Sequence, residues 1–164
     1  MTNSPESNKQ PVQAVSDQRD LRKILGPSRF SAEGFLGADP RQPEEIMSDD
    51  ANTLGTLGID RARLVDALRK AYDAAEQALG APITVSAGCS AVHYGARGKI
   101  PSPFANEGTF AKGETVITHA ASGASFSVTP LSLYLIDKHG FFQGKGSPYR
   151  VEPDVAAKMM GLIK

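Results

Sequence analysis

Apolar side chains recur at steps of three and four residues through the first half of the chain, which is the period of an amphipathic helix. The clearest stripe covers residues 61–79 and predicts a long helix that buries one face. Asp60 is a suitable N-cap for this helix, Gly80 a suitable end, and Pro82 excludes its continuation. The apolar members of the stripe are Leu64, Val65, Leu68, Ala71, Tyr72, Ala75 and Leu79.

Four further helices are shorter or less regular. One is predicted over residues 43–58, with a proline at its first position and a glycine at its end. The others are expected after Ser16, after Thr129 and after Glu152, where a capping residue or a proline precedes a run of apolar positions.

The pattern changes at residue 83, where apolar residues begin to alternate with hydroxyl-bearing ones. Residues 83–97 predict one long bent strand or two short ones, and residues 114–119 and 125–129 predict two more. Residues 98–113, which are rich in Gly and Pro, predict a loop.

The last two strands are expected to form a hairpin with a two-residue turn at residues 122–123. In that register Ile117 faces Val128 and His119 faces Phe126, so all four side chains share one face of the sheet. We expect the helices to cover this apolar face.

Strands that are joined by short turns pair antiparallel, and here they are segregated from the helices along the chain. The order predicts an α+β fold: a small antiparallel sheet of three or four strands, helices packed on one face, and N-terminal helices preceding the strands. Residues 1–15 hold few apolar side chains and predict a disordered tail, which leaves residues 16–164 as a single globular domain.

The net charge is zero, from 18 basic and 18 acidic residues, which argues against a nucleic-acid partner. The two halves differ, however. Residues 1–82 hold 10 basic and 13 acidic groups, and residues 83–164 hold 8 and 5. A small anion is therefore a suitable partner for the second half.

The chain has no apolar run of the length that crosses a membrane, about 20 residues, and its first residues lack the apolar core of a secretory signal. Its single cysteine fits a reducing compartment. These features predict a cytoplasmic protein with no membrane partner.

Cys89 and the histidines His93, His119 and His139 are the candidates for metal or nucleophile chemistry. Cys89 and His93 share a face of a strand but stand about 13 Å apart at roughly 3.3 Å per residue, too far for one ion. We therefore expect no metal and no cofactor. A nucleophilic Cys89 paired with a histidine is retained as a minor alternative, so whether the protein is an enzyme stays open.

The stretch HGFFQGKGSPYR is glycine-rich but departs from the phosphate-loop signature in spacing, in its missing hydroxyl and in following a helix. Gly144 and Gly146 can still expose backbone N–H groups to an anion, with Lys145 and Arg150 close by. For this segment we favour the other interpretation, a docking loop whose two phenylalanines, Phe141 and Phe142, fill the core while the glycines let the chain turn.

Four other side chains complete the candidate ligand-binding set. Arg97 and Lys99 precede a Pro-containing extended segment, His119 lies toward the turn of the hairpin, and His139 ends a helix. If Val92 and Tyr94 face the core, His93 and Arg97 lie on the opposite, open polar face of the sheet. That face either binds a ligand or partner or is merely solvated. The full set is Arg97, Lys99, His119, His139, Lys145 and Arg150.

The segments SRFSAEGFLGADP, GKIPSPFANEGTF and LYLIDKHGFFQGKGSPYR resemble a family of small bacterial proteins over about residues 20–164. The resemblance implies no particular activity and assigns no functional residue.

Three classes of function fit these features. The preferred one is a domain that binds a small anionic molecule through basic, glycine-rich loops. The second is a protein-interaction or homo-oligomerising module that uses the open sheet face or an edge strand. The third is an enzyme with a Cys/His site.

Overall fold

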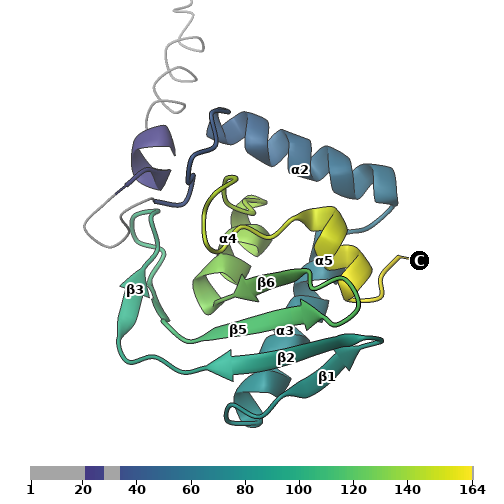
Figure 1. The fold of residues 1–164 in the computed structure, drawn as a ribbon. Helices are drawn as coiled ribbons and strands as arrows, with labels where there is room; N and C mark the ends of the chain where they lie inside the picture. The colour runs from purple at the N-terminus through teal and green to yellow at the C-terminus, as the bar shows by residue number, and fades with distance from the viewer. Residues whose placement is uncertain (1–20, 28–33, 164) are drawn as a thin grey trace, which may run out of the picture.

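A computed structural model of the protein describes residues 21–27 and 34–163 (Figure 1). Residues 21–25 form a helical turn, as the pattern after Ser16 predicts, and it ends at Gly26. The predicted disordered tail, residues 1–15, lies outside the described residues.

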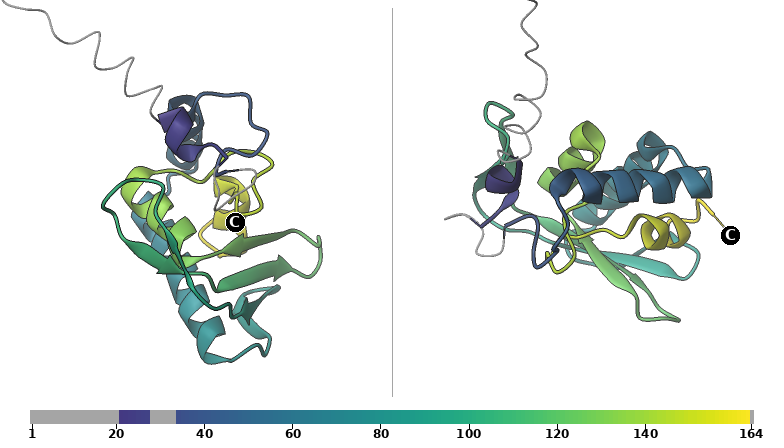
Figure 2. Two further views of the ribbon diagram at one scale, coloured as in Figure 1. Left: turned by 90° about the vertical axis from the view of Figure 1, so that its left-hand side faces the viewer. Right: turned by 90° about the horizontal axis from the view of Figure 1, so that it is seen from above.

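The fold has two layers, a four-stranded antiparallel sheet and a group of helices on one of its faces (Figures 1 and 2). The strands follow the spatial order β1-β2-β5-β6. They are β1 (Ile83–Ser86), β2 (Cys89–Tyr94), β5 (Glu114–His119) and β6 (Ser125–Val128). The predicted α+β fold is therefore confirmed, including its four strands and its helices on one side.

The helices begin and end close to where their capping residues predict. They are α2 (Pro43–Leu57), α3 (Arg61–Gln77), α4 (Pro130–His139) and α5 (Pro153–Met159). Gly58 and Gly140 end α2 and α4 in the left-handed conformation, with φ of 69° and 63°. Thr129 and Ser132 satisfy each other's backbone N–H groups at the start of α4, which closes that helix end.

The loop predicted over residues 98–113 is wrong in part, because it contains a small hairpin. Strands β3 (Lys99–Pro101) and β4 (Thr109–Ala111) form a separate two-stranded sheet that packs against α4. Strands of three residues are too short to show an alternation of side chains, so the breakers dominate the sequence pattern. Phe110 contacts Tyr134 of α4 with ring centroids 4.8 Å apart.

The predicted register of the β5–β6 hairpin is also wrong, by two residues. Ile117 pairs with Phe126, and Thr115 pairs with Val128. The turn is longer than predicted because His119 exchanges backbone hydrogen bonds with Gly123 and Ala124. A shift of two residues keeps each side chain on its own face, so the predicted apolar face is confirmed.

Strand β2 presents the opposite face from the one assumed for it. Cys89 and Ala91 are buried toward the helices, whereas Tyr94 is 55% exposed on the open face. His93 points inward with them, with its ring centroid 5.2 Å from that of Tyr72 in α3 and its Nδ1 hydrogen-bonded to Thr115.

The glycine-rich segment after α4 docks on the segment before α2 through direct backbone contact. Gly144 N donates to Phe35 O at 2.8 Å, and Ala38 N donates to Lys145 O at 3.1 Å. Phe141 and Phe142 are fully buried, so the docking role predicted for this loop is confirmed.

Two glycine-to-alanine substitutions test this packing, one at the close contact and one at an open position in a helix. A Cβ at Gly144 would collide with the backbone of Leu36, whereas a Cβ at Gly55 in α2 meets nothing within 4 Å. We expect Gly144→Ala to lower the free energy of unfolding by about 2 kcal/mol or more through overpacking. Gly55→Ala should raise it by roughly 1 kcal/mol, because alanine favours the helix. Urea unfolding measures both, and equal effects would contradict the close approach of the two segments.

Candidate functional site

The glycine-rich loop does hold a carboxylate, but the carboxylate belongs to the chain itself. Lys145 N donates to Asp39 Oδ2 at 3.0 Å, and Arg41 adds its backbone N, Nε and Nη2 to the same carboxylate. The side chain of Asp39 is completely buried. The hydrogen bond from Arg41 holds the pKa of Asp39 well below its usual range, against the opposing effect of burial. The backbone donors expected to receive an external anion thus receive Asp39.

The side chain of Arg150 is buried and fully used inside the protein. Its guanidinium donates to both oxygens of Asp50 at 2.5 and 2.8 Å, and to both oxygens of Glu152 at 3.1 and 3.0 Å. Nη1 also donates to Gln143 O at 2.8 Å. An arginine has five N–H donors, so none is left for a ligand.

Three other predicted cations lie on the surface. The side chains of Arg97, Lys99 and Lys145 are exposed, and within residues 34–163 none of them forms an ion pair. None of them lines the cavity described below.

The two predicted histidines have structural contacts. His139 Nε2 lies 2.8 Å from Glu107 Oε2, and its ring stacks on Phe104 with centroids 3.9 Å apart. These contacts attach the β3–β4 hairpin to α4. The hydrogen bond with His139 also lowers the pKa of Glu107. His119 is hydrogen-bonded through Nδ1 to Ser122 Oγ at 2.7 Å, within the hairpin turn.

Cys89 is buried and lies directly opposite His119 on the neighbouring strand. The histidine nearest to Cys89 across the sheet is therefore His119, and not His93, whose distance along the strand was considered in the sequence. No hydrogen bond joins Cys89 to a histidine in the part of the chain that the structure describes, and no three His, Cys, Asp or Glu residues there are grouped to hold a metal ion.

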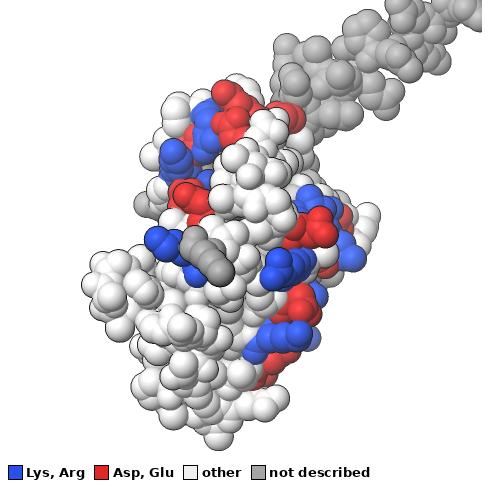
Figure 3. All heavy atoms as spheres, turned by 90° about the vertical axis from the view of Figure 1, so that its right-hand side faces the viewer, with Lys and Arg blue, Asp and Glu red and all other residues white. Residues whose placement is uncertain are grey.

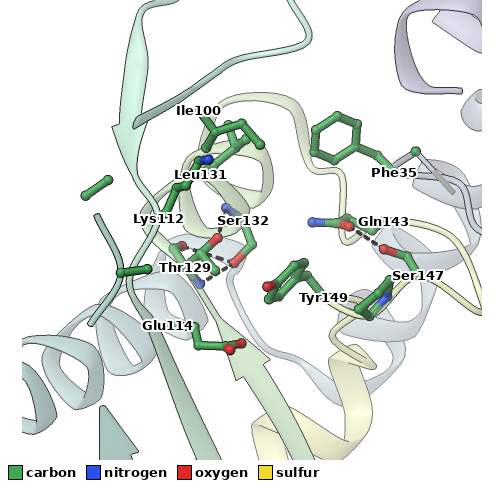
Figure 4. A pocket seen from close by; sticks show the side chains of 14 residues that line it. Phe35, Ile100, Lys112, Glu114, Thr129, Leu131, Ser132, Gln143, Ser147 and Tyr149 are labelled. Carbon is green, nitrogen blue, oxygen red and sulfur yellow. Dashed lines mark hydrogen bonds between the residues drawn. The ribbon is translucent and has the colours of Figure 1, made fainter. Parts of the chain in front are cut away.

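A cavity of about 400 Å³ lies between the β3–β4 hairpin, the start of β5, the start of α4 and residues 143–149 (Figure 4). Its volume is within the usual range of small-molecule sites, roughly 300–1,000 Å³. Phe35, Ile100 and Leu131 make it apolar on one side. The polar side chains that line it are Lys112, Glu114, Thr129, Ser132, Gln143, Ser147 and Tyr149.

Gln143 is the most constrained of these residues. Its side chain is aimed into the cavity although the residue is only 3% exposed, and its backbone is left-handed with φ of 70° (Figure 4). Ser147 Oγ donates to its Oε1 at 2.6 Å, and Arg150 holds its carbonyl. Its amide nitrogen has no hydrogen-bond partner among the described residues. A left-handed glutamine is uncommon, and such strain concentrates at functional sites.

Tyr149 and Glu114 form a second polar pair in the cavity. Burial raises the pKa of Tyr149, and the negative charge of Glu114 raises it further. The Tyr149 hydroxyl is therefore neutral and can donate a hydrogen bond, and the Glu114 carboxylate can accept one.

The charged side chains are unevenly distributed over the surface. Residues 83–94 and 115–129, which supply nearly all of the four-stranded sheet, contain no Lys, Arg, Asp or Glu. Figure 3 shows the resulting uncharged area beside the charged stripes. Lys112, which is exposed, and Glu114, which is half-buried, stand at the border of this area and line the cavity.

Comparisons with protein-family models, curated proteins and solved structures find no match to the chain. The resemblance to a family of small bacterial proteins therefore stays a prediction. In the described residues, no helix has both the length and the apolar character needed to cross a membrane.

The Asp39 site predicts a specific response to acid. Because the folded-state pKa of Asp39 is lowered, its contribution to stability is present above about pH 4, the ordinary pKa of aspartate, and is lost as the pH falls toward the folded-state value. Asp39→Asn should lower the free energy of unfolding at pH 7 by about 3 kcal/mol and flatten its decline in acid.

Asp49→Asn is the matched control, because Asp49 binds the same Arg41 from a half-exposed position. It should change stability by less than about 1 kcal/mol. Urea unfolding between neutral and acid pH measures both variants, and an unaltered acid decline in Asp39→Asn would rule out this role of Asp39.

Proposed function

We propose that the protein is a small-molecule-binding domain whose ligand occupies the cavity lined by Gln143, Lys112 and Tyr149. The observation that carries the proposal is the amide of Gln143, which lacks an acceptor among the described residues and is held inside a formed cavity. Nε2 is not among the fully buried unpaired atoms, so it is open to the cavity, where a ligand oxygen can accept its hydrogen bond.

The surroundings of Gln143 support a binding role because they fix the direction of its amide. The hydrogen bond from Ser147 to Oε1 identifies Nε2 as the atom that faces the cavity. The contact of Arg150 with the Gln143 carbonyl fixes the backbone in its left-handed conformation. Binding sites gain affinity from this kind of preorganisation, since less freedom is lost when the ligand binds.

The ligand proposed here keeps the expected negatively charged group but changes the residues that receive it. Lys112 and the Gln143 amide are the donors at the cavity, whereas Arg150 and the backbone of Lys145 serve the fold. Phe35, Ile100 and Leu131 favour a ligand that also has an apolar part.

The other two classes of function have less support. An interaction module would use the uncharged open face of the sheet around Tyr94, but nothing on that face indicates its partner. A Cys/His enzyme would need the Cys89 thiol in hydrogen-bond contact with a base, and the described residues provide no such contact.

A thermal-shift screen of carboxylates, phosphates and amino acids at millimolar concentration tests the proposal. A ligand at about 100 times its dissociation constant should stabilise the fold by about 2.7 kcal/mol. Gln143→Gly should abolish most of that shift, because it removes the amide while glycine accepts the positive φ.

Asn106→Gly is the matched control, since Asn106 is also an amide at positive φ but is exposed and outside the cavity. It should leave the ligand-induced shift unchanged. Circular dichroism checks that Gln143→Gly and Asn106→Gly are folded. If the ligand raises the melting temperature of Gln143→Gly as much as that of the wild type, the cavity is excluded as the site.

A further inference from the structure

The cavity contains two opposite charges that face it from one short segment. Lys112 and Glu114 both line it, on the stretch that joins β4 to β5. Within the described parts of the chain, neither side chain forms an ion pair with the other or with a third residue.

Gly113 explains why both charges face the same way. Side chains alternate between the two sides of an extended segment, so residues 112 and 114 point together and residue 113 points back. Gly113 is buried, and a Cβ there would lie 3.1–3.3 Å from the ring of His93 and the hydroxyl of Tyr72. The segment is therefore pressed against β2 and α3 on one side and presents its charges to the cavity on the other.

The donors and the acceptor occupy different parts of the cavity. Figure 4 shows Lys112 beside Leu131 and the Gln143 amide across the cavity from it, whereas Glu114 lies beyond Thr129, with the Tyr149 ring between it and Gln143. The Glu114 carboxylate can accept several hydrogen bonds, so it is able to bind a ligand cation at the cavity.

From this arrangement we infer that the ligand is a zwitterion, a free α-amino acid with an apolar side chain. The inference rests on the proposed function. The ligand carboxylate binds Lys112 and the Gln143 amide, its ammonium binds Glu114, and its side chain packs on Phe35 and Leu131.

Charge balance decides between the ligand classes. A simple anion would pair with Lys112 but would leave Glu114 without a counter-charge in a partly closed site, and a simple amine would do the reverse. Glu114 is half-buried and Lys112 is exposed, so a bound ligand takes mainly Glu114 out of water. A charge that loses its water without gaining a partner is unfavourable, so a ligand carrying both charges is preferred.

Two matched series of compounds test this. Each contains an amino acid, the acid without its amino group and the amine without its carboxylate. The first series is L-phenylalanine, 3-phenylpropanoate and phenethylamine, and the second is L-leucine, 4-methylpentanoate and 3-methylbutylamine. Calorimetric titration of the full chain should show at least one amino acid binding about tenfold or more tighter than both of its analogues, a difference of about 1.4 kcal/mol.

Two variants then test which residue binds the ammonium of the ligand and which binds its carboxylate. Glu114→Gln should weaken the amino acid about tenfold and leave the acid unchanged or improved, and Lys112→Gln should weaken both. Glu76→Gln is the control for the first, because the charge of Glu76 likewise raises the pKa of a nearby tyrosine, Tyr72, but Glu76 does not line the cavity. Lys99→Gln is the control for the second, and both controls should bind as wild type does.

The outcomes separate this inference from the proposed function. If an acid binds as well as its amino acid and loses affinity in Gln143→Gly, the zwitterion is excluded and the cavity remains the binding site. If none of the six compounds binds at millimolar concentration, the zwitterion is likewise excluded, and the wider screen alone decides the proposed function. Binding that survives Gln143→Gly, Lys112→Gln and Glu114→Gln excludes both.

Discussion

The buried guanidinium of Arg150 is the contact on which the arrangement of this protein most depends. It joins Asp50 in α2 to Glu152 at the start of α5, and it holds the carbonyl of Gln143 between them. A buried ion pair adds little net stability, because both partners lose their water. Removal of one partner is costly, however, since the other charge is then left alone. The guanidinium therefore acts chiefly by fixing the position of three segments, and Gln143 owes its direction to it.

The sequence predicts those features that depend on local periodicity and capping. The boundaries of α2 and α4 follow from Pro43, Gly58, Thr129 and Gly140, and the buried face of the β5–β6 hairpin follows from alternation. Alternation shows which residues share a face of a strand but not which residues they pair with. The buried face of the β5–β6 hairpin is therefore predicted, while its register is wrong by two residues. For β2 the sequence does not show even which face is buried, because Cys89, Ala91 and His93 are no more apolar than the residues between them.

The candidate site was harder to predict because its partners are far apart in the sequence. Arg150 and Asp50 are separated by 100 positions, and Lys145 and Asp39 by 106. A basic residue in a glycine-rich loop looks the same in a sequence whether its counter-ion is a ligand or a distant aspartate. Gln143 and the Lys-Gly-Glu triplet at residues 112–114 were detectable in principle, as a polar residue after two buried phenylalanines and as two charges around a glycine.

The separate β3–β4 hairpin bears on how a molecule would enter the cavity. Its three-residue strands pair only with each other within the described residues, and its attachment to α4 includes the His139–Glu107 contact and the stacked Phe104 ring. The hairpin can thus move away from α4 without breaking any hydrogen bond of the four-stranded sheet. Local opening of a segment costs less free energy than global unfolding, so a molecule in the proposed site would exchange by opening of this hairpin. For the proposed ligand, the residence time would then be set by the hairpin and not by the lifetime of the fold.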